Sequence, residues 1–79
     1  MRRSGVNSSS ITSIGYDNQR RELEIEFRSS GDVYRYFDVP MEEFNEFLAA
    51  ESKGTYLNQV FKMHSYPYVL VRRGRRRAG

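Results

Sequence analysis

Five arginines lie close together near the end of the chain, just after two tyrosines. The arginines are Arg72, Arg73, Arg75, Arg76 and Arg77, and the tyrosines are Tyr66 and Tyr68. Clustered arginines neutralise phosphates and release condensed counterions, and tyrosine rings stack on unpaired bases. The segment therefore predicts contact with nucleic acid, and with RNA in particular. The alternative is a solvated tail that keeps the protein soluble or touches nucleic acid without consequence.

The net positive charge of the chain comes from this end alone. Residues 1–65 hold eight Lys or Arg against ten Asp or Glu, whereas residues 66–79 hold five Arg and no acid. Runs of like charge at a terminus are often flexible interaction arms. We therefore expect residues 72–79 to form a basic, disordered tail, and we expect the rest of the chain to bind polyanions poorly without it.

The other residues offer little for catalysis or metal binding. The chain has no cysteine and a single histidine, His64, which excludes disulfides, thiolate zinc sites and all-histidine sites. No nucleophile is arranged with His64 in a recognisable motif, so we expect a solvated side chain near a helix end. The acids alternate along one strand or open a helix, where they have ordinary structural roles. The sequence thus predicts no enzyme, no cofactor and no metal.

Chain length and hydropathy narrow the class of protein further. A chain of 79 residues makes one domain at most. No apolar run approaches the roughly 20 residues that a membrane span needs. No apolar segment follows the first five residues, which argues against a signal peptide. We expect a soluble, cytoplasmic protein with no membrane contact.

The first predicted strand spans residues 11–16. Ile11 and Ile14 are three positions apart, which breaks the strict alternation of a strand. A bulge near Ser13 or Gly15 would let both isoleucines face the core.

The second and third predicted strands define the two faces of a sheet. In residues 22–27, apolar side chains alternate with glutamates, as in an antiparallel strand with one wet face. Residues 33–39 are rich in β-branched and aromatic side chains, which favour a strand. An arginine opposite the glutamate row is favourable, so Arg35 should point outward while Tyr34 and Tyr36 point into the core. The alternative is that the two tyrosines stack on RNA bases.

Two helices are predicted after these strands. Pro40 suits the first helical position, and Asp38 is a plausible capping acceptor. The apolar stripe of this first helix consists of Phe44, Phe47 and Leu48. Apolar side chains four apart predict a second, short helix over residues 54–63.

These elements predict an α+β fold, with a three-stranded antiparallel β-meander followed by two helices packed on one face. Residues 69–71 suit either a short edge strand or an extended arm. The side chains that we expect to be largely buried are Ile25, Phe27, Tyr36, Phe44 and Leu48.

An ordered series of residues between positions 9 and 68 follows a known pattern. In the strands the matching residues are Ser9, Ile11, Ser13, Ile14, Gly15, Tyr16, Asp17, Leu23, Ile25, Phe27, Tyr34, Tyr36, Val39 and Pro40. In the helical part they are Phe44, Leu48, Ala50, Ser52, Gly54, Tyr56, Asn58, Tyr66, Pro67 and Tyr68. The series resembles the KTSC domain, a small module named for the C-terminal domain of some lysyl-tRNA synthetases. The resemblance implies a small bacterial or phage protein, and it implies RNA binding only through the association with the synthetase.

The resemblance also marks six motif positions, which are Tyr34, Tyr36, Ser52, Gly54, Tyr56 and Asn58. The last four surround the junction of the two predicted helices. Their functional interpretation is a backbone nest that holds an anion near Lys53. The alternative is helix capping and turn geometry.

We therefore expect a disordered N-terminus over residues 1–8, a KTSC-like domain over 9–71 and the basic tail over 72–79. The predicted function is a small, non-enzymatic binding module for RNA or other nucleic acid that acts through the arginine tail. The alternative is a protein-interaction module, for example an accessory or phage factor.

Overall fold

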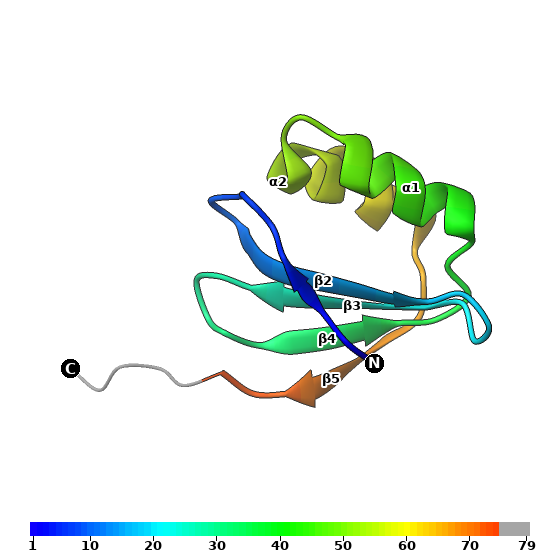
Figure 1. Cartoon of the computed structure of the whole chain (residues 1–79), viewed down its shortest axis with the longest axis horizontal. Helices are drawn as coiled ribbons and strands as arrows, with labels where there is room; N and C mark the ends of the chain where they lie inside the picture. The colour runs from blue at the N-terminus through cyan, green and yellow to red at the C-terminus, as the bar shows by residue number, and fades with distance from the viewer. Residues whose placement is uncertain (75–79) are drawn as a thin grey trace.

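The computed structural model describes residues 1–74 and has an α+β fold, in which helices cover one face of an antiparallel sheet (Figure 1). The strands lie in the sheet in chain order, as β1 (Ser4–Gly5), β2 (Ile11–Asp17), β3 (Glu22–Phe27), β4 (Val33–Tyr36) and β5 (Tyr68–Arg72). Each strand runs antiparallel to its neighbour. The alternation of β3 sets the two faces of the sheet, as predicted.

The prediction of a three-stranded sheet was wrong, because the structure adds a strand at each edge. β1 pairs with β2 through Ser4 and Ile14. It has only two residues, both exposed, so it shows no alternation of apolar and polar side chains by which a strand could be predicted. β5 pairs Leu70 with Tyr34 and Tyr68 with Tyr36, so the edge-strand alternative is correct. All five residues of β5 are exposed, which removes the periodicity by which a strand is recognised.

The helical layer consists of α1 (Met41–Ala49) and one further helical segment. That segment runs through α2 (Lys53–Tyr56), a π-helical turn η1 (Leu57–Phe61) and a 3-10 turn η2 (Lys62–His64). Pro40 is the N-cap of α1 instead of its first residue, and no side chain caps this helix. Asp38, the expected cap, takes a left-handed φ of 61° in the preceding turn. No helix within residues 1–74 is long and apolar enough to cross a bilayer.

The core joins the inner face of the sheet to one side of the helical layer. Side chains with less than 2% exposure include Ile11, Leu23, Ile25, Val39, Phe47 and Phe61. Among the predicted core residues, Ile25 and Tyr36 are buried, while Phe27 and Phe44 are only half-buried. The prediction for Leu48 was wrong, since its side chain is 42% exposed. Phe47 faces the core instead, and Leu48 lies about 100° further round the helix.

On the outer face of the sheet, the carboxylate of Glu24 is buried and paired with two arginines. Glu24 is 3% exposed and lies opposite Arg35 in the register, as the charge-pairing argument predicted. Its carboxylate accepts hydrogen bonds from Arg35 at 2.6 and 2.9 Å and from Arg3 at 2.8 Å. Burial alone would raise the pKa of Glu24, but hydrogen bonds from Arg35 and Arg3 outweigh it and hold the pKa below its ordinary value. The buried carboxylate of this face is thus neutralised by arginines of the same chain.

The N-terminal segment packs closely onto β2. A Cβ added at Gly15 would lie 2.6 Å from the carbonyl oxygen of Arg2. The bulge between Ile11 and Ser13 lies close to the predicted place and allows Ile11 and Ile14 to be buried together. Residues 1–8, which we expected to be disordered, thus include a short strand held against a glycine.

Replacing Gly15 with alanine should destabilise the domain by about 1–3 kcal/mol, because the new methyl group forces the backbone at Arg2 away from β2. Thermal melts measure this change. Gly5→Ala is the matched control, since the nearest atom to a Cβ there is 3.9 Å away. Equal melting temperatures for the two variants would show that the N-terminal segment does not pack on Gly15.

Candidate functional site

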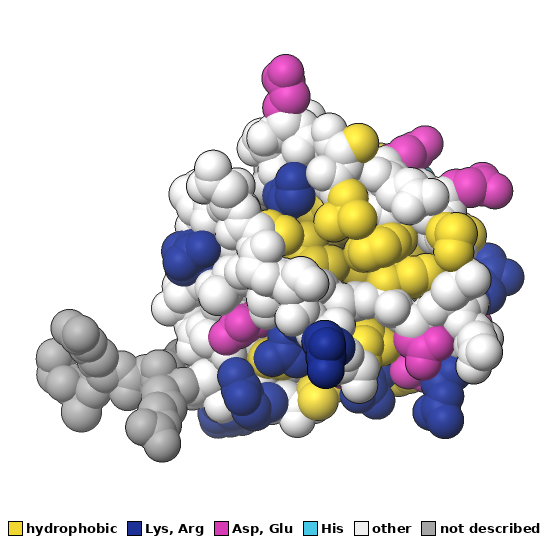
Figure 2. Space-filling model, in the orientation of Figure 1, with side chains coloured by type: hydrophobic (Ala, Val, Ile, Leu, Met, Phe, Trp, Pro, Cys, Tyr) yellow, Lys and Arg dark blue, Asp and Glu magenta, His cyan; other side chains and the backbone are white. Residues whose placement is uncertain are grey.

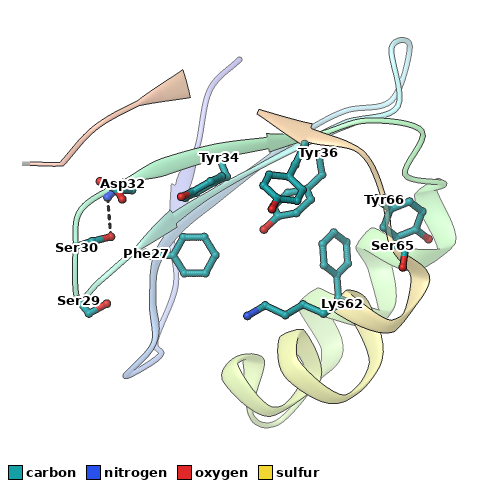
Figure 3. A pocket seen from close by; sticks show the side chains of 11 residues that line it. Phe27, Ser29, Ser30, Asp32, Tyr34, Tyr36, Lys62, Ser65 and Tyr66 are labelled. Carbon is teal, nitrogen blue, oxygen red and sulfur yellow. Dashed lines mark hydrogen bonds between the residues drawn. The ribbon is translucent and has the colours of Figure 1, made fainter. Parts of the chain in front are cut away.

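A pocket of about 610 Å³ lies between the inner face of β3, β4 and β5 and the end of the second helical segment (Figure 3). Six of its eleven lining residues are aromatic, and the other five are polar or charged. We call it the aromatic pocket, and its aromatic residues are Phe27, Tyr34, Tyr36, Phe61, Tyr66 and Tyr68. In Figure 3, Phe27, Tyr34 and Tyr36 project from the strands toward the segment that carries Lys62.

The rings of the aromatic pocket contact one another edge-on or tilted. Ring centroids are 5.7 Å apart for Phe27 and Tyr34, 5.7 Å for Tyr34 and Tyr68, and 5.5 Å for Tyr36 and Tyr68. Tyr36 also contacts Phe61 at 4.9 Å, which joins the sheet to the helical layer. Tyr36 is therefore part of the core, whereas Tyr68, which is 61% exposed, forms the rim.

Three tyrosine hydroxyls at this pocket have no hydrogen-bond partner in the described part of the chain. Within residues 1–74, nothing hydrogen-bonds the hydroxyls of Tyr34, Tyr36 or Tyr68. Burial, together with the nearby Tyr68 and Tyr34, raises the pKa of Tyr36 to about 12. The Tyr36 hydroxyl is thus protonated at neutral pH, and it can donate a hydrogen bond to a ligand but cannot act as a base.

Charged side chains stand at the ends of the aromatic pocket. Lys62 is exposed, reaches toward Phe27 in Figure 3, and forms no ion pair within residues 1–74. Asp32, in contrast, is 7% exposed, and its Oδ1 accepts a hydrogen bond from the backbone N–H of Gly74 at 2.7 Å. Asp32 thus fixes the chain just beyond β5.

A second hollow adjoins the aromatic pocket. Its lining consists of Asp32, Tyr34, Leu70, Arg73 and Gly74, so Tyr34 and Asp32 belong to both. Arg72 ends β5, and its guanidinium lies 3.7 Å from a carboxylate oxygen of Glu26.

The structure therefore brings Tyr66 and Tyr68 together with Tyr34 and Tyr36 in one pocket, and Arg73 lines the adjoining hollow with Tyr34. The other predicted tail residues, Arg75, Arg76 and Arg77, lie outside the described residues.

A second polar group lies inside the helical layer, around the buried carboxylate of Glu43. This Glu43 cluster consists of Glu43, Tyr56, His64 and Tyr66. The hydroxyls of Tyr56 and Tyr66 donate to Glu43, the latter at 2.9 Å, and the Nδ1 of His64 hydrogen-bonds the same carboxylate. Glu43 is 5% exposed. These hydrogen bonds hold the segment from Tyr56 to Tyr66 against α1. The expectation that His64 is only solvated was therefore wrong.

The pKa shifts in the Glu43 cluster follow from these bonds. Burial alone would raise the pKa of Glu43, but the hydrogen bonds from Tyr56, Tyr66 and His64 outweigh it and hold the pKa below its ordinary value. Burial and the bond to Glu43 raise the pKa of Tyr66 to about 12 and also raise that of Tyr56. The carboxylate is ionised and its tyrosine partners are protonated at neutral pH, which suits a structural role.

The motif residues at the helix junction make structural contacts. The hydroxyl of Ser52 accepts a backbone N–H of the first turn of α2 at 3.3 Å. A Cβ at Gly54 would lie 2.5 Å from the hydroxyl of Ser10. The ammonium of Lys53 donates to two carbonyls at the end of α1, at 3.1 and 3.3 Å. Asn58 is exposed. These contacts support the capping alternative over the anion nest.

Sequence reasoning missed Lys62 and Glu43. Lys62 adjoins the buried Phe61 but comes from a different region of the chain than the strand tyrosines, so nothing in the sequence links them. Glu43 carried a usable signal, because it lies four positions before the buried Phe47 and therefore on the same helix face. No group of acidic or histidine side chains within residues 1–74 has the arrangement of a metal site.

The sequence profile of the KTSC domain matches residues 7–66, which is most of the chain. The chain belongs to the KTSC domain family. An uncharacterized protein of Stutzerimonas stutzeri strain A1501 is 48% identical over 68 residues, which cover 86% of this chain and 94% of the relative. A protein of Tsukamurella paurometabola is 42% identical over 57 residues, which cover 72% and 84% of the two chains.

The KTSC fold is also matched by a solved structure. The crystal structure of a KTSC domain protein from Yersinia pestis has a TM-score of 0.83 and 39% sequence identity, and the match covers 90% of this chain and 97% of that one. The resemblance drawn from the sequence is thereby confirmed. The KTSC profile ends at residue 66, so β5 and the arginines lie beyond it.

Proposed function

We propose that this KTSC domain is a non-enzymatic module that binds single-stranded nucleic acid, RNA foremost, through its C-terminal arginines. The observation that supports the proposal most strongly is the course of β5. This strand begins at Tyr68 in the aromatic pocket and ends at Arg72, and Arg73 then lines the adjoining hollow with Tyr34. Stacking surfaces and phosphate-neutralising side chains therefore follow one another along a single strand, as single-strand binding requires.

The distribution of charge favours the same edge of the molecule. Figure 2 shows acidic side chains projecting from the helical layer, and Lys or Arg side chains gathered toward the lower edge, where β5 lies in Figure 1. Residues 1–65 carry a net charge of −2 from their eight basic and ten acidic residues. On the outer sheet face, Arg3 and Arg35 are paired with Glu24. Phosphates are thus expected at β5 and the arginines that follow it.

Changing all five tail arginines to glutamine should weaken RNA binding at least about tenfold at low salt. If about four of them engage phosphates, log K of the unmodified chain should fall with log salt at a slope of roughly −2.8, and the variant should lose most of this slope. Fluorescence anisotropy with a labelled single-stranded RNA at several salt concentrations measures both quantities.

Arg20→Gln is the control, because this exposed side chain belongs to the turn between β2 and β3. It should leave the affinity nearly unchanged. Equal affinities for the unmodified chain and the five-arginine variant would contradict the proposed role of the tail.

A second candidate is a protein-interaction module. The observation that favours it is the apolar character of β5, where Val69, Leu70 and Val71 are 48%, 42% and 43% exposed. In the sheet formed by residues 1–74, β5 is an edge strand, and exposed edges accept strands from other chains. A pull-down from lysate with and without nuclease separates the two candidates. A partner that persists after nuclease treatment favours protein interaction, and one that is lost favours nucleic acid.

A further inference from the structure

The aromatic pocket is an open site beside the core of the domain. Its volume of about 610 Å³ lies within the range of roughly 300–1,000 Å³ that is usual for small-ligand sites. The strand residues deeper in the core, Leu23 and Ile25, are fully covered, whereas Phe27 and Tyr34 on the same face remain half-buried. Apolar ring surface is therefore left available to an occupant.

The polar groups of the pocket suit an occupant that carries both donors and acceptors. The hydroxyls of Tyr34, Tyr36 and Tyr68 have no partner within residues 1–74, and a hydroxyl both donates and accepts. The edges of nucleobases carry donors and acceptors side by side, and their faces stack on aromatic rings. A purely aliphatic occupant would leave these hydroxyls unsatisfied.

The cations near the pocket suit an anion on either side of the occupant. Lys62 reaches over one side of the aromatic pocket, and Arg73 lines the adjoining hollow, which shares Tyr34 and Asp32 with the pocket. The acidic lining residue, Asp32, uses one carboxylate oxygen to hold Gly74. An internal nucleotide of a single strand has this form, since its base is flanked by two phosphates.

We propose that the aromatic pocket holds one unpaired base of a single-stranded nucleic acid, with Lys62 at one neighbouring phosphate and Arg73 at the other. The inference rests on the proposed function and adds a base-binding subsite to it. A base inside a duplex is stacked and paired, so duplex RNA or DNA should not occupy the pocket.

The test measures binding of mononucleotides to the full chain by NMR, with uridine and adenosine monophosphate as probes and ribose 5-phosphate as the probe without a base. Both nucleotides should shift the amide signals of Phe27, Tyr34 and Lys62, and ribose phosphate should not. Tyr68→Leu should weaken binding at least about fivefold, while Tyr68→Phe, which keeps the ring, should retain most of it. Lys62→Gln should weaken binding, and Arg20→Gln, which removes the same charge outside the pocket, should not.

The outcomes separate this subsite from the proposed function. If the Tyr68 and Lys62 variants bind single-stranded RNA as well as the unmodified chain, and mononucleotides shift no pocket signals, the subsite is refuted while RNA binding by the tail stands. If mononucleotides bind the pocket but changing the tail arginines leaves RNA affinity intact, the subsite stands and the role of the tail is refuted. Pocket binding of a proline-rich peptide in place of nucleotides would overturn the subsite in favour of peptide recognition.

Discussion

Replacing Phe47 with alanine is expected to lower the free energy of unfolding by about 3–5 kcal/mol, the cost of a large cavity in a core. Phe47 is 0% exposed and contacts Tyr56 and Phe61 at ring distances of 5.3 and 5.7 Å. It is thus the side chain by which α1 holds the second helical segment. Because small domains have total stabilities near the lower end of about 5–15 kcal/mol, this variant should be substantially unfolded at room temperature.

Chemical denaturation of Phe47→Ala and Leu48→Ala provides a matched comparison on neighbouring positions of α1. Leu48 is 42% exposed, so its truncation should cost less than about 1 kcal/mol. Similar losses for both variants would mean that α1 presents a different face to the sheet. The half-buried Phe44, which stacks on Tyr16 at 4.6 Å, should give an intermediate loss.

Replacing Glu43 with alanine is expected to be the next most damaging change, by about 2–3 kcal/mol. The loss arises because the hydroxyls of Tyr56 and Tyr66 lose a charged acceptor, and bonds to charged groups are worth about 1.5–3 kcal/mol each. The loss is smaller than that of two full bonds because both tyrosines are partly exposed, so that water can bind their hydroxyls in the variant. Glu42→Ala is the control on the same helix, since Glu42 is exposed, whereas Glu46 also accepts a hydrogen bond from the Tyr56 hydroxyl at 3.2 Å. This control should cost less than about 1 kcal/mol.

The Glu43 cluster should also make stability depend on pH. The pKa of Glu43 is lower in the folded chain than its ordinary value, so the unfolded chain binds this proton more tightly. Its contribution is therefore complete above the ordinary carboxyl pKa of about 4.3 and is lost as the pH falls through the folded-state pKa. Denaturation at a series of pH values should show a weaker acid dependence in Glu43→Gln than in the unmodified chain. An unchanged dependence would assign the acid sensitivity to Glu24, whose pKa is also lowered.

The sequence predicted those elements whose side chains repeat with a clear period. The strict alternation of residues 22–27 fixed β3 and its faces, and the charge of Arg35 fixed the orientation of β4. β1 was not predicted, because it has only two residues, and β5 was predicted only as one of two alternatives for residues 69–71, because it is exposed along its whole length. Their pairing depends on distant strands, which local propensity does not describe.

The candidate site was predicted only in part, for a related reason. Tyr34 and Tyr36 were recognised as a motif and assigned to the core, yet both also line an open pocket. Tyr68 was predicted to stack on bases only because it precedes the arginines in the sequence. Lys62 was not recognised, since the four-residue spacing predicted an ordinary helix there, whereas the position of Lys62 depends on a π-helical turn and a 3-10 turn. A pocket is formed by side chains from separate elements, so its existence follows from the packing and not from any one stretch of sequence.

The most direct measurement of the central claim is NMR mapping of the full chain with a single-stranded RNA of about eight nucleotides, a length within the usual range for single-strand sites. The proposal predicts that amide signals of Phe27, Tyr34, Lys62, Tyr68 and Arg73 shift, while those of Glu24 and Arg35 on the outer face do not. A matched duplex RNA should shift the pocket signals much less. Shifts that gather on the outer face, or no shifts within residues 1–74 at any RNA concentration, would contradict the claim that β5 and the aromatic pocket form the binding surface.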